Sequence, residues 1–394
     1  LSSYFSFRFN YGVGNFFKDI NSVEPGQFVK FDTTNLTKKK YWNYPLNNEK
    51  FNLSEGNLIE RCGELIEEVT SEHLVSDVPI GSLLSGGLDS SLLTSIMKKK
   101  NDKTFHTFSA SFDEVDYDEN KFSKIISEKV NSDHLNIVLN SSDYEDKLNK
   151  TIAHSASPLS IPHEIALNSL FGEISKHTKV VISGEGADEM FGGYGRVQSS
   201  GYDYEKIRFV NKFVPQNLQS GVLKIFGSNK EFDWSKYQSQ MDHFFDIYKW
   251  FGFDEKMGIL NSEVKKDIKY DAEIKKFWTD EFEQMQNLDV KEKIIFLFQK
   301  HHLQCLLHRL DIHSMAHSVE ARVPFCDHRI IEFVNKVPYS MKFKWKSSYH
   351  KFISIFNNSF KNSEKNDISK YLLRKLSLRY LPKEISYKKK LGFP

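Results

Sequence analysis

The pattern of apolar and polar residues changes near residue 54. In residues 1–50, aromatic and polar residues alternate over 5–9, and apolar and polar residues alternate over 27–31. Because successive side chains of a β-strand point to opposite faces, both runs predict strands. The polar stretch 41–53, which is rich in asparagine, predicts a linker.

A helical spacing of apolar residues begins after Ser54, a residue type that favours helix N-caps. The apolar positions of this predicted helix are Leu58, Cys62, Leu65, Ile66 and Val69. Beyond it, short apolar runs predict strands over 78–84, 104–112, 135–139 and 179–183. Helical patterns separate these runs, over 90–100, 119–130, 143–154 and 163–176. Such alternation predicts an α/β fold with a doubly wound parallel sheet.

After Gly195 the pattern is mainly helical, with aromatic-rich amphipathic segments over 239–251 and 291–310. The expected fold class is therefore α/β: a doubly wound parallel sheet, a helical C-terminal region and a short β-rich N-terminal region.

Composition excludes some classes of partner. The 54 basic and 52 acidic residues give a formal net charge of +2, which lends no support to nucleic-acid binding. No apolar run approaches the roughly 20 residues of a membrane helix, so we expect no membrane partner. The three cysteines are Cys62, Cys305 and Cys326. Their odd number and wide spacing predict reduced thiols, and hence a cytoplasmic protein.

One glycine-rich loop follows the first strand of the predicted sheet and opens a helix. It reads Ser85-Gly86-Gly87-Leu88-Asp89-Ser90. Glycines allow close backbone approach, and the N–H groups at a helix start favour an anion. Neither the Walker lysine nor a Gly-x-Gly-x-x-Gly pattern is present. Asp89 would repel a phosphate unless Mg²⁺ lay between them; the alternative is a glycine-rich turn capped by Asp and Ser.

An acidic loop follows the strand predicted over 179–183. It reads Ser183-Gly184-Glu185-Gly186-Ala187-Asp188-Glu189. One of its carboxylates suits a metal ion, and another can orient a substrate or move a proton. If the two loops follow neighbouring strands, Asp89 and Asp188 can share one Mg²⁺ ion at the carboxyl edge of the sheet. The alternative is a solvated acidic loop.

These motifs carry a family resemblance. The loop 85–90 resembles the pyrophosphate loop of the ATP-pyrophosphatase superfamily. The segments 78–81, 183–194, 309–328 and 388–393 narrow this to the asparagine synthetase family, in the family's order. The resemblance covers about residues 55–394 and implies a sheet of the adenine nucleotide alpha hydrolase-like type.

The resemblance implies a ligase reaction. A substrate carboxylate, aspartate in the type members, attacks the α-phosphorus of ATP and releases pyrophosphate. Ammonia from glutamine then converts the acyl-adenylate into an amide and AMP. The implied partners are therefore small molecules, with ATP and Mg²⁺ at the site, and a homodimer is left open.

It also implies roles for individual residues. Those matching ATP-binding positions are Leu83, Ser85, Gly86, Gly87, Asp89, Ser90, Ala110, Ser183 and Gly184. Asp89 and Asp188 match the Mg²⁺ ligands. Lys390 matches a lysine that binds the phosphates, on a tail that we expect to close over ATP. Glu185 matches a glutamate that handles the amine proton or positions the intermediate.

Residues 1–50 resemble the end of a glutamine amidotransferase domain and its linker, which leaves 51–394 as the ATP-binding synthetase domain. In the family that first domain carries an N-terminal catalytic cysteine, whereas residue 1 here is Leu. We therefore expect a remnant of the domain that cannot hydrolyse glutamine.

Departures from the family pattern leave alternatives open. Ala156-Ser157-Pro158 replaces an acidic segment, and 192–196 resembles homologues associated with surface polysaccharide genes. The substrate could thus be a sugar acid. A cyclising synthetase, of the β-lactam or lasso-peptide type, is a second alternative, and a non-catalytic scaffold subunit is a third.

Overall fold

The computed structural model describes residues 2–12, 15–17, 19–46, 49–101, 103–112, 120–139 and 144–389. The chain divides into two compact units, each assembled from separate segments. The first unit consists of Leu1–Asn48, Arg196–His301 and Ser348–Asn362. The second consists of Glu49–Gly195, His302–Ser347 and Ser363–Pro394. Within the described ranges, no helix is long and apolar enough to cross a lipid bilayer.

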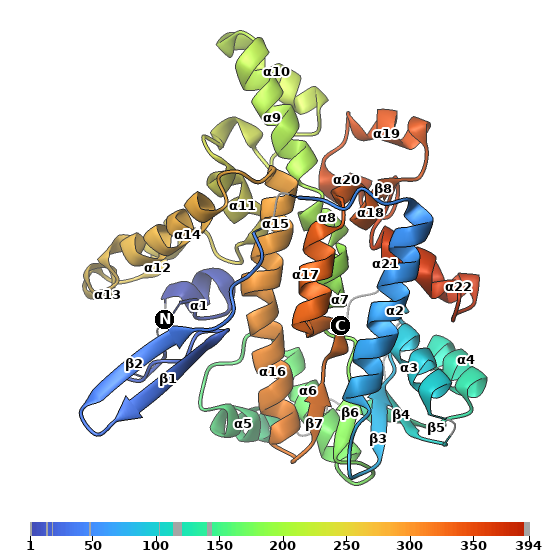
Figure 1. Cartoon of the computed structure of the whole chain (residues 1–394). Helices are drawn as coiled ribbons and strands as arrows, with labels where there is room; N and C mark the ends of the chain where they lie inside the picture. Colours follow the sequence, from blue (N-terminus) through green and yellow to red (C-terminus); the bar gives the residue numbers. More distant parts are fainter. Residues whose placement is uncertain are drawn as a thin grey trace. The chain divides into compact units, whose positions relative to one another are not determined.

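The second unit is built on a five-stranded parallel sheet (Figure 1). Its strands are β3 (Ile80–Leu83), β4 (His106–Phe112), β5 (Asp133–Leu139), β6 (Val180–Ile182) and β7 (Glu320–Arg322). They lie in the order β5-β4-β3-β6-β7, so the chain runs outward from β3 in one direction and from β6 in the other. The predicted parallel sheet is confirmed, and its switch point lies between β3 and β6.

Helices connect the strands and cover both faces of this sheet. The connections are α3 (Leu88–Lys100), α4 (Asn120–Val130), α5 (Tyr144–Ser155), α6 (His163–Ile174) and α16 (Leu303–Met315). α6 and α16 pack on one face, where Phe171 and Leu310 join a core cluster with Phe108 and Val181 of the strands. Right-handed crossovers that run in opposite directions along a sheet place their helices on opposite faces, so α3 and α4 cover the other face.

The helix predicted after Ser54 is α2 (Glu55–His73), and the Ser54 side chain accepts a hydrogen bond from the Asn57 backbone N–H. Leu58, Cys62, Ile66 and Val69 are buried, as the helical spacing predicts. The remaining elements of this unit are α7 (Ala187–Phe191), η4 (Pro324–Cys326), α17 (His328–Lys336), α18 (Tyr339–Lys342), β8 (Lys344–Trp345), β9 (Asp367–Ile368), α21 (Tyr371–Ser377) and α22 (Lys383–Ser386).

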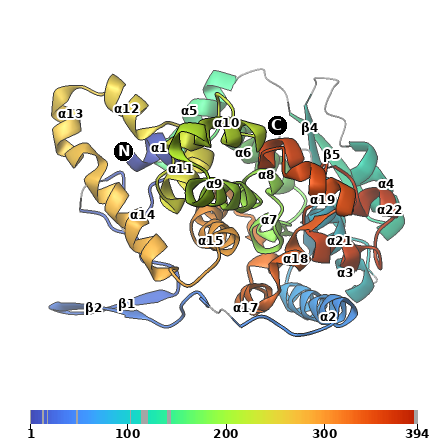
Figure 2. The ribbon, with the colours of Figure 1, turned by 90° about the horizontal axis from the view of Figure 1, so that it is seen from above.

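The first unit contains an N-terminal hairpin, seen edge-on in Figure 2, and mostly helices. Strand β1 (Gln27–Asp32), predicted over 27–31, pairs with β2 (Asn35–Lys40) in an antiparallel register. The helices are α1 (Ser2–Phe7), α8 (Gly195–Gln198), α9 (Gly201–Phe213), α10 (Gln216–Ile225), η1 (Trp234–Lys236), α11 (Gln240–Tyr248), α12 (Phe253–Ile259), α13 (Ser262–Asp267), η2 (Lys269–Asp271), α14 (Ala272–Gln284), α15 (Val290–Leu297), the π-helical turn η3 (Phe298–His302), α19 (Ser348–Ser354) and α20 (Ser359–Asn362).

The strand predicted over 5–9 is wrong, because residues 2–7 form helix α1. The fully buried Lys256 explains the helix: its ammonium donates to Ser2 O at 3.1 Å and to Ser6 Oγ at 2.8 Å. Lys256 also pairs with the buried carboxylate of Asp271 at 2.7 Å. A helix brings residues 2 and 6 to one face within about one turn, whereas a strand would hold them much farther apart. The tertiary contact therefore overrides the alternating pattern.

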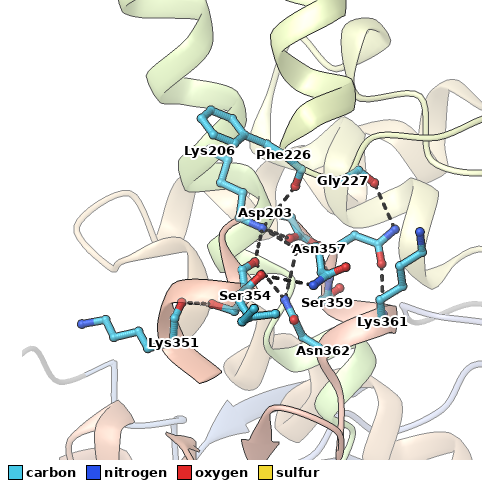
Figure 3. A network of polar contacts seen from close by, with 12 residues as sticks. Asp203, Lys206, Phe226, Gly227, Lys351, Ser354, Asn357, Ser359, Lys361 and Asn362 are labelled. Carbon is cyan, nitrogen blue, oxygen red and sulfur yellow. Dashed lines mark hydrogen bonds and ion pairs between the residues drawn. The ribbon is translucent and has the colours of Figure 1, made fainter. Parts of the chain in front are cut away.

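A second lysine, largely but not fully buried, holds α9 to a segment distant in sequence (Figure 3). Lys206 Nζ lies 3.2 Å from Asp203 Oδ1 and donates to three carbonyl oxygens: Ser354 at 3.1 Å, Asn357 at 2.6 Å and Phe226 at 3.4 Å. Burial lowers the pKa of Lys206 and raises the pKa of Asp203. The pair is therefore held in a weakly polar environment, where losing either partner is costly.

We predict that Lys206→Met lowers the free energy of unfolding by about 3 kcal/mol, because it leaves the Asp203 carboxylate buried without its counter-charge. Lys206→Met combined with Asp203→Asn should destabilise by less than the sum of the single changes, by about 2 kcal/mol. Urea denaturation of the four proteins measures this coupling. Lys212→Met, on the exposed side of the same helix, is the control and should change stability little. Strict additivity would mean that the two side chains do not interact.

Candidate functional site

The loop after β3 is closed by two serines and one glycine. Ser90 Oγ accepts a hydrogen bond from the Ser85 backbone N–H at 3.2 Å and lies 3.1 Å from Ser85 Oγ. Gly86 has a φ of +70°, and a Cβ there would lie 2.5 Å from Ser123 N. A side chain is therefore excluded both by conformation and by space. The loop ends at Gly87, the N-cap of α3, so the first N–H groups of a thirteen-residue helix follow it.

The loop after β6 packs directly on the first loop, because β3 and β6 are neighbouring strands. A Cβ at Gly184 would lie 2.9 Å from Ser90 N and 3.2 Å from Asp89 Cβ, so a larger residue would force the loops apart. Ser183, the first residue of the second loop, is buried. The condition set in the sequence analysis, that the two loops follow neighbouring strands, is thus met.

Asp89 and Asp188 meet at one ammonium group, that of Lys370. Lys370 Nζ lies 2.6 Å from Asp89 Oδ2 and 2.7 Å from Asp188 Oδ1. Its side chain is only 5% exposed, whereas those of Asp89 and Asp188 are 21% and 19% exposed. The carboxylates therefore form a partly open surface with a buried cation behind them.

Sequence reasoning missed Lys370, although it lies in Ser369-Lys370-Tyr371, at the start of a helix. No glycine-rich loop or cluster of acidic residues adjoins this lysine in the sequence to mark it. Burial alone lowers the pKa of a lysine, but the charges of Asp188 and Asp89 outweigh burial and raise the pKa of Lys370. The ammonium is therefore charged at neutral pH, and it offsets the repulsion between the two carboxylates.

Arg374 fixes this lysine in place from the next helical turn. Its Nε donates to Ser369 O at 2.8 Å, and its Nη1 donates to Ser386 O at 2.8 Å and to Lys388 O at 3.1 Å. One buried guanidinium thus ties the residue before Lys370 to the C-terminal segment as far as residue 388. Lys390, which the sequence analysis places at the phosphates, lies outside the described residues.

The two aspartates fit a Mg²⁺ site that a phosphate completes. Their oxygens converge on a single cationic nitrogen, so they can reach a common ion. Mg²⁺ is commonly held by one or two carboxylates together with substrate phosphates. In the described part of the chain, no group of three or more His, Cys, Asp and Glu is arranged to hold a metal. The donor set therefore suits a metal ion that arrives with a phosphate ligand.

Two further acids of the second loop differ in exposure. Glu185 is half-buried, and its backbone N–H donates to Ser183 Oγ at 3.3 Å. Glu189 is 1% exposed. Burial, followed by the charges of Asp188 and Glu185, raises the pKa of Glu189 to about 8, against a hydrogen bond with Tyr194 that lowers it. Glu189 is thus mainly protonated at neutral pH, and Glu185 is the less buried of the two glutamates.

The predicted nucleotide contacts Leu83 and Ala110 lie on adjacent strands near their carboxyl ends. Leu83 is the last residue of β3 and pairs with Phe108 of β4, two residues before Ala110. Both side chains are partly buried and pack against the same core cluster. They form an apolar edge beside the first loop, where parallel α/β sheets usually bind ligands.

The chain is similar to several curated proteins, and many of them carry the same activity in their names. The chain is 28% identical over 408 residues to asparagine synthetase [glutamine-hydrolyzing] 1 of Bacillus subtilis, covering 100% of this chain and 58% of the relative. It is 26% identical to asparagine synthetase [glutamine-hydrolyzing] 3 of the same organism, covering 96% and 55%. Amidase chyE of Penicillium rubens is 23% identical, covering 94% and 57%. The chain thus spans about half the length of the curated relatives that it matches.

Among solved structures, an NH3-dependent NAD synthetase from Campylobacter jejuni matches 37% of this chain and 62% of its own, at 16% identity and a TM-score of 0.26. An NMN synthetase from Francisella tularensis matches 69% and 99%, at 14% identity and a TM-score of 0.27. The family model for asparagine synthase matches residues 61–394, a range that contains both loops and Lys370. The chain belongs to the asparagine synthase family.

Proposed function

We propose that the chain is an ATP-dependent amide-forming ligase, which adenylates a carboxylic acid and transfers ammonia to the acyl group. The observation that carries the proposal is the convergence of Asp89 and Asp188 on Lys370, at the switch point of a parallel sheet. Family membership supports ATP-dependent amidation in general. The names of the relatives make aspartate the proposed acid and glutamine the proposed source of ammonia.

In the first step, an oxygen of the substrate carboxylate attacks the α-phosphorus of ATP. The bond from that phosphorus to the bridging oxygen breaks, and pyrophosphate leaves. We propose that the N–H groups after Gly87 and the hydroxyls of Ser85 and Ser90 hold the pyrophosphate end of ATP, since no side chain blocks the backbone at Gly86. In the same proposal, Leu83 and Ala110 offer an apolar surface to the base, and Ser183 and Gly184 contact the α-phosphate.

Charge neutralisation is the main chemical task of this step, because phosphoryl transfer depends on positioning and electrostatics. Asp89 and Asp188 would hold Mg²⁺, which neutralises the pyrophosphate leaving group when it is bound. Lys370 adds a fixed positive charge directly behind these carboxylates. We propose that Lys390 adds a second positive charge from the C-terminal segment that Arg374 anchors at residue 388.

In the second step, ammonia attacks the acyl carbon, and the bond from that carbon to the AMP oxygen breaks. A proton must leave the attacking nitrogen. We propose that Glu185 accepts it or positions the intermediate, because Glu185 is the more exposed glutamate of the loop, whereas Glu189 is buried and mainly protonated.

We also propose the boundaries expected from the sequence: residues 1–50 as the end of a glutamine amidotransferase domain with its linker, and 51–394 as the synthetase domain. The β1–β2 hairpin is compatible with the first of these. A cytoplasmic location is part of the proposal, and the free thiols of Cys62, Cys305 and Cys326 support it.

The proposed chemistry predicts AMP and pyrophosphate as products. Chromatography of the adenine nucleotides after incubation with ATP, Mg²⁺, ammonium and aspartate should give AMP in step with amide. If ADP is the only adenine product, the proposed reaction is wrong. An ATP–pyrophosphate exchange screen over aspartate, glutamate and uronic acids then identifies the acid, with each acid omitted in turn as the control.

Asp89→Asn and Asp188→Asn should each slow adenylation by about a hundredfold or more, because each removes an anionic Mg²⁺ ligand without changing side-chain size. Raising Mg²⁺ should recover part of the rate in both variants. Asp133→Asn is a matched control, since Asp133 lies at the opposite, amino-terminal end of strand β5. Full activity of Asp188→Asn at ordinary Mg²⁺ would exclude a shared metal.

Lys370→Met should slow adenylation by about 10²–10³-fold, the effect of removing one positive donor from a transition state. Thermal unfolding distinguishes a loss of catalysis from a loss of folded protein. Lys370→Met leaves two carboxylates without a counter-charge, and combining it with Asp89→Asn removes one of them. The double variant should recover stability but not activity. Lys176→Met, which loses an exposed pair with Glu173, is the control. Normal pyrophosphate exchange by folded Lys370→Met would remove Lys370 from the mechanism.

A further inference from the structure

Charge is distributed unevenly over the first unit. Residues 206–230, which contain most of α9 and all of α10, include no Asp or Glu. Residues 348–362, which contain α19 and α20, include none either. In a chain with 54 basic and 52 acidic residues, two acid-free segments that belong to one compact unit form a local basic region. Lys206 is paired with Asp203, and the other basic residues of these segments are Arg208, Lys212, Lys224, Lys230, Lys351 and Lys361.

The same two segments expose large apolar side chains. On α9 and α10, Phe213 is 63% exposed and Ile225 is 60% exposed. On α19, Tyr349 is 68% exposed and Phe352 is 59% exposed. The further exposed apolar residues of these segments are Phe209, Leu218, Ile355 and Phe356. Exposed apolar side chains and a few basic side chains therefore occur together in both segments, with no acid among them.

The two segments are joined by contacts near the C-terminal end of α19 and just after it. The Lys206 ammonium joins α9 to the carbonyl oxygens of Ser354 and Asn357 (Figure 3). Asn358 Nδ2 donates to Gly227 O at 3.2 Å, just beyond the end of α10. The rings of Phe232 and Phe360 stack with centroids 4.5 Å apart. We call the exposed side chains of 208–225 and 349–356 the basic apolar surface.

We propose that the basic apolar surface docks the chain on an anionic lipid bilayer. Exposed aromatic and aliphatic side chains flanked by lysines and arginines are typical of helices that lie in a membrane interface. The acid-free segments complement the negative charge of anionic headgroups. Nucleic acid fits less well, because aliphatic side chains such as Leu218, Ile225 and Ile355 cannot stack on bases as aromatic rings do.

A peripheral membrane surface would not be expected from the composition of the whole chain. A net charge of +2 and the lack of a long apolar run predict no membrane partner. Neither criterion detects a peripheral surface, because such a surface depends on how charges and apolar groups are grouped, not on their totals. The proposal is independent of the reaction proposed for the second unit.

Vesicle co-sedimentation tests the proposal. The chain should bind vesicles of phosphatidylcholine with phosphatidylglycerol, and should not bind phosphatidylcholine alone. Charge reversal by Lys212→Glu, Lys224→Glu and Lys351→Glu together should weaken binding by at least about a hundredfold, since losing three basic residues at roughly fivefold each already gives that factor and the new carboxylates add repulsion. The matched control reverses three exposed lysines elsewhere in the unit, at Lys39, Lys266 and Lys276, and should retain binding. An equal loss of vesicle binding in both triple variants would show that binding does not depend on the basic apolar surface, and would overturn the proposal.

Insertion depth gives a second, separate readout. With brominated acyl chains in the vesicles, Phe213→Trp should lose fluorescence, whereas Phe31→Trp on the β1–β2 hairpin should not. Three results would overturn the proposal: no binding to anionic vesicles, a dimer in light scattering that Phe213→Ser and Phe352→Ser abolish, or RNA binding that these changes abolish while vesicle binding is unaffected.

Discussion

The ammonium of Lys370, held between Asp89 and Asp188, is the interaction on which the candidate site depends. Two carboxylates that converge on one point repel each other, and the repulsion grows as water is excluded. The buried lysine offsets that repulsion and leaves the carboxylates partly open. It also joins three segments that are far apart in sequence. The same cation can therefore hold the two carboxylates together and assist a reaction that develops negative charge.

The parallel sheet provides the geometry that this interaction requires. Because β3 and β6 are neighbours on either side of the switch point, their following loops emerge at the same edge. Because Gly184 has no side chain, the second loop can pack directly against Asp89 and Ser90. The order of the strands thus determines which loops meet, and Gly184 determines how closely the two loops approach each other.

Two lysines, Lys256 fully buried and Lys206 largely buried, have a comparable structural role in the first unit. Lys256 joins Asp271 to helix α1, and Lys206 joins Asp203 to the segment that follows α19. In each case an ammonium pairs with a buried carboxylate and donates to oxygens from distant parts of the chain: a carbonyl and a serine hydroxyl for Lys256, and carbonyls for Lys206. A long, flexible side chain with three donors suits this task, because it can reach across a packed interior.

The sequence by itself determined the elements between residues 54 and 183 and both loops of the site, because periodicity, caps and glycine motifs are local signals. Only the tertiary structure decided that residues 2–7 are helical and that Lys370 belongs with Asp89 and Asp188. The three-residue strand β7 was also missed, because Glu320 and Arg322 give no apolar run. Each of these features depends on partners far away in the chain, and a pattern of neighbouring residues carries no information about them.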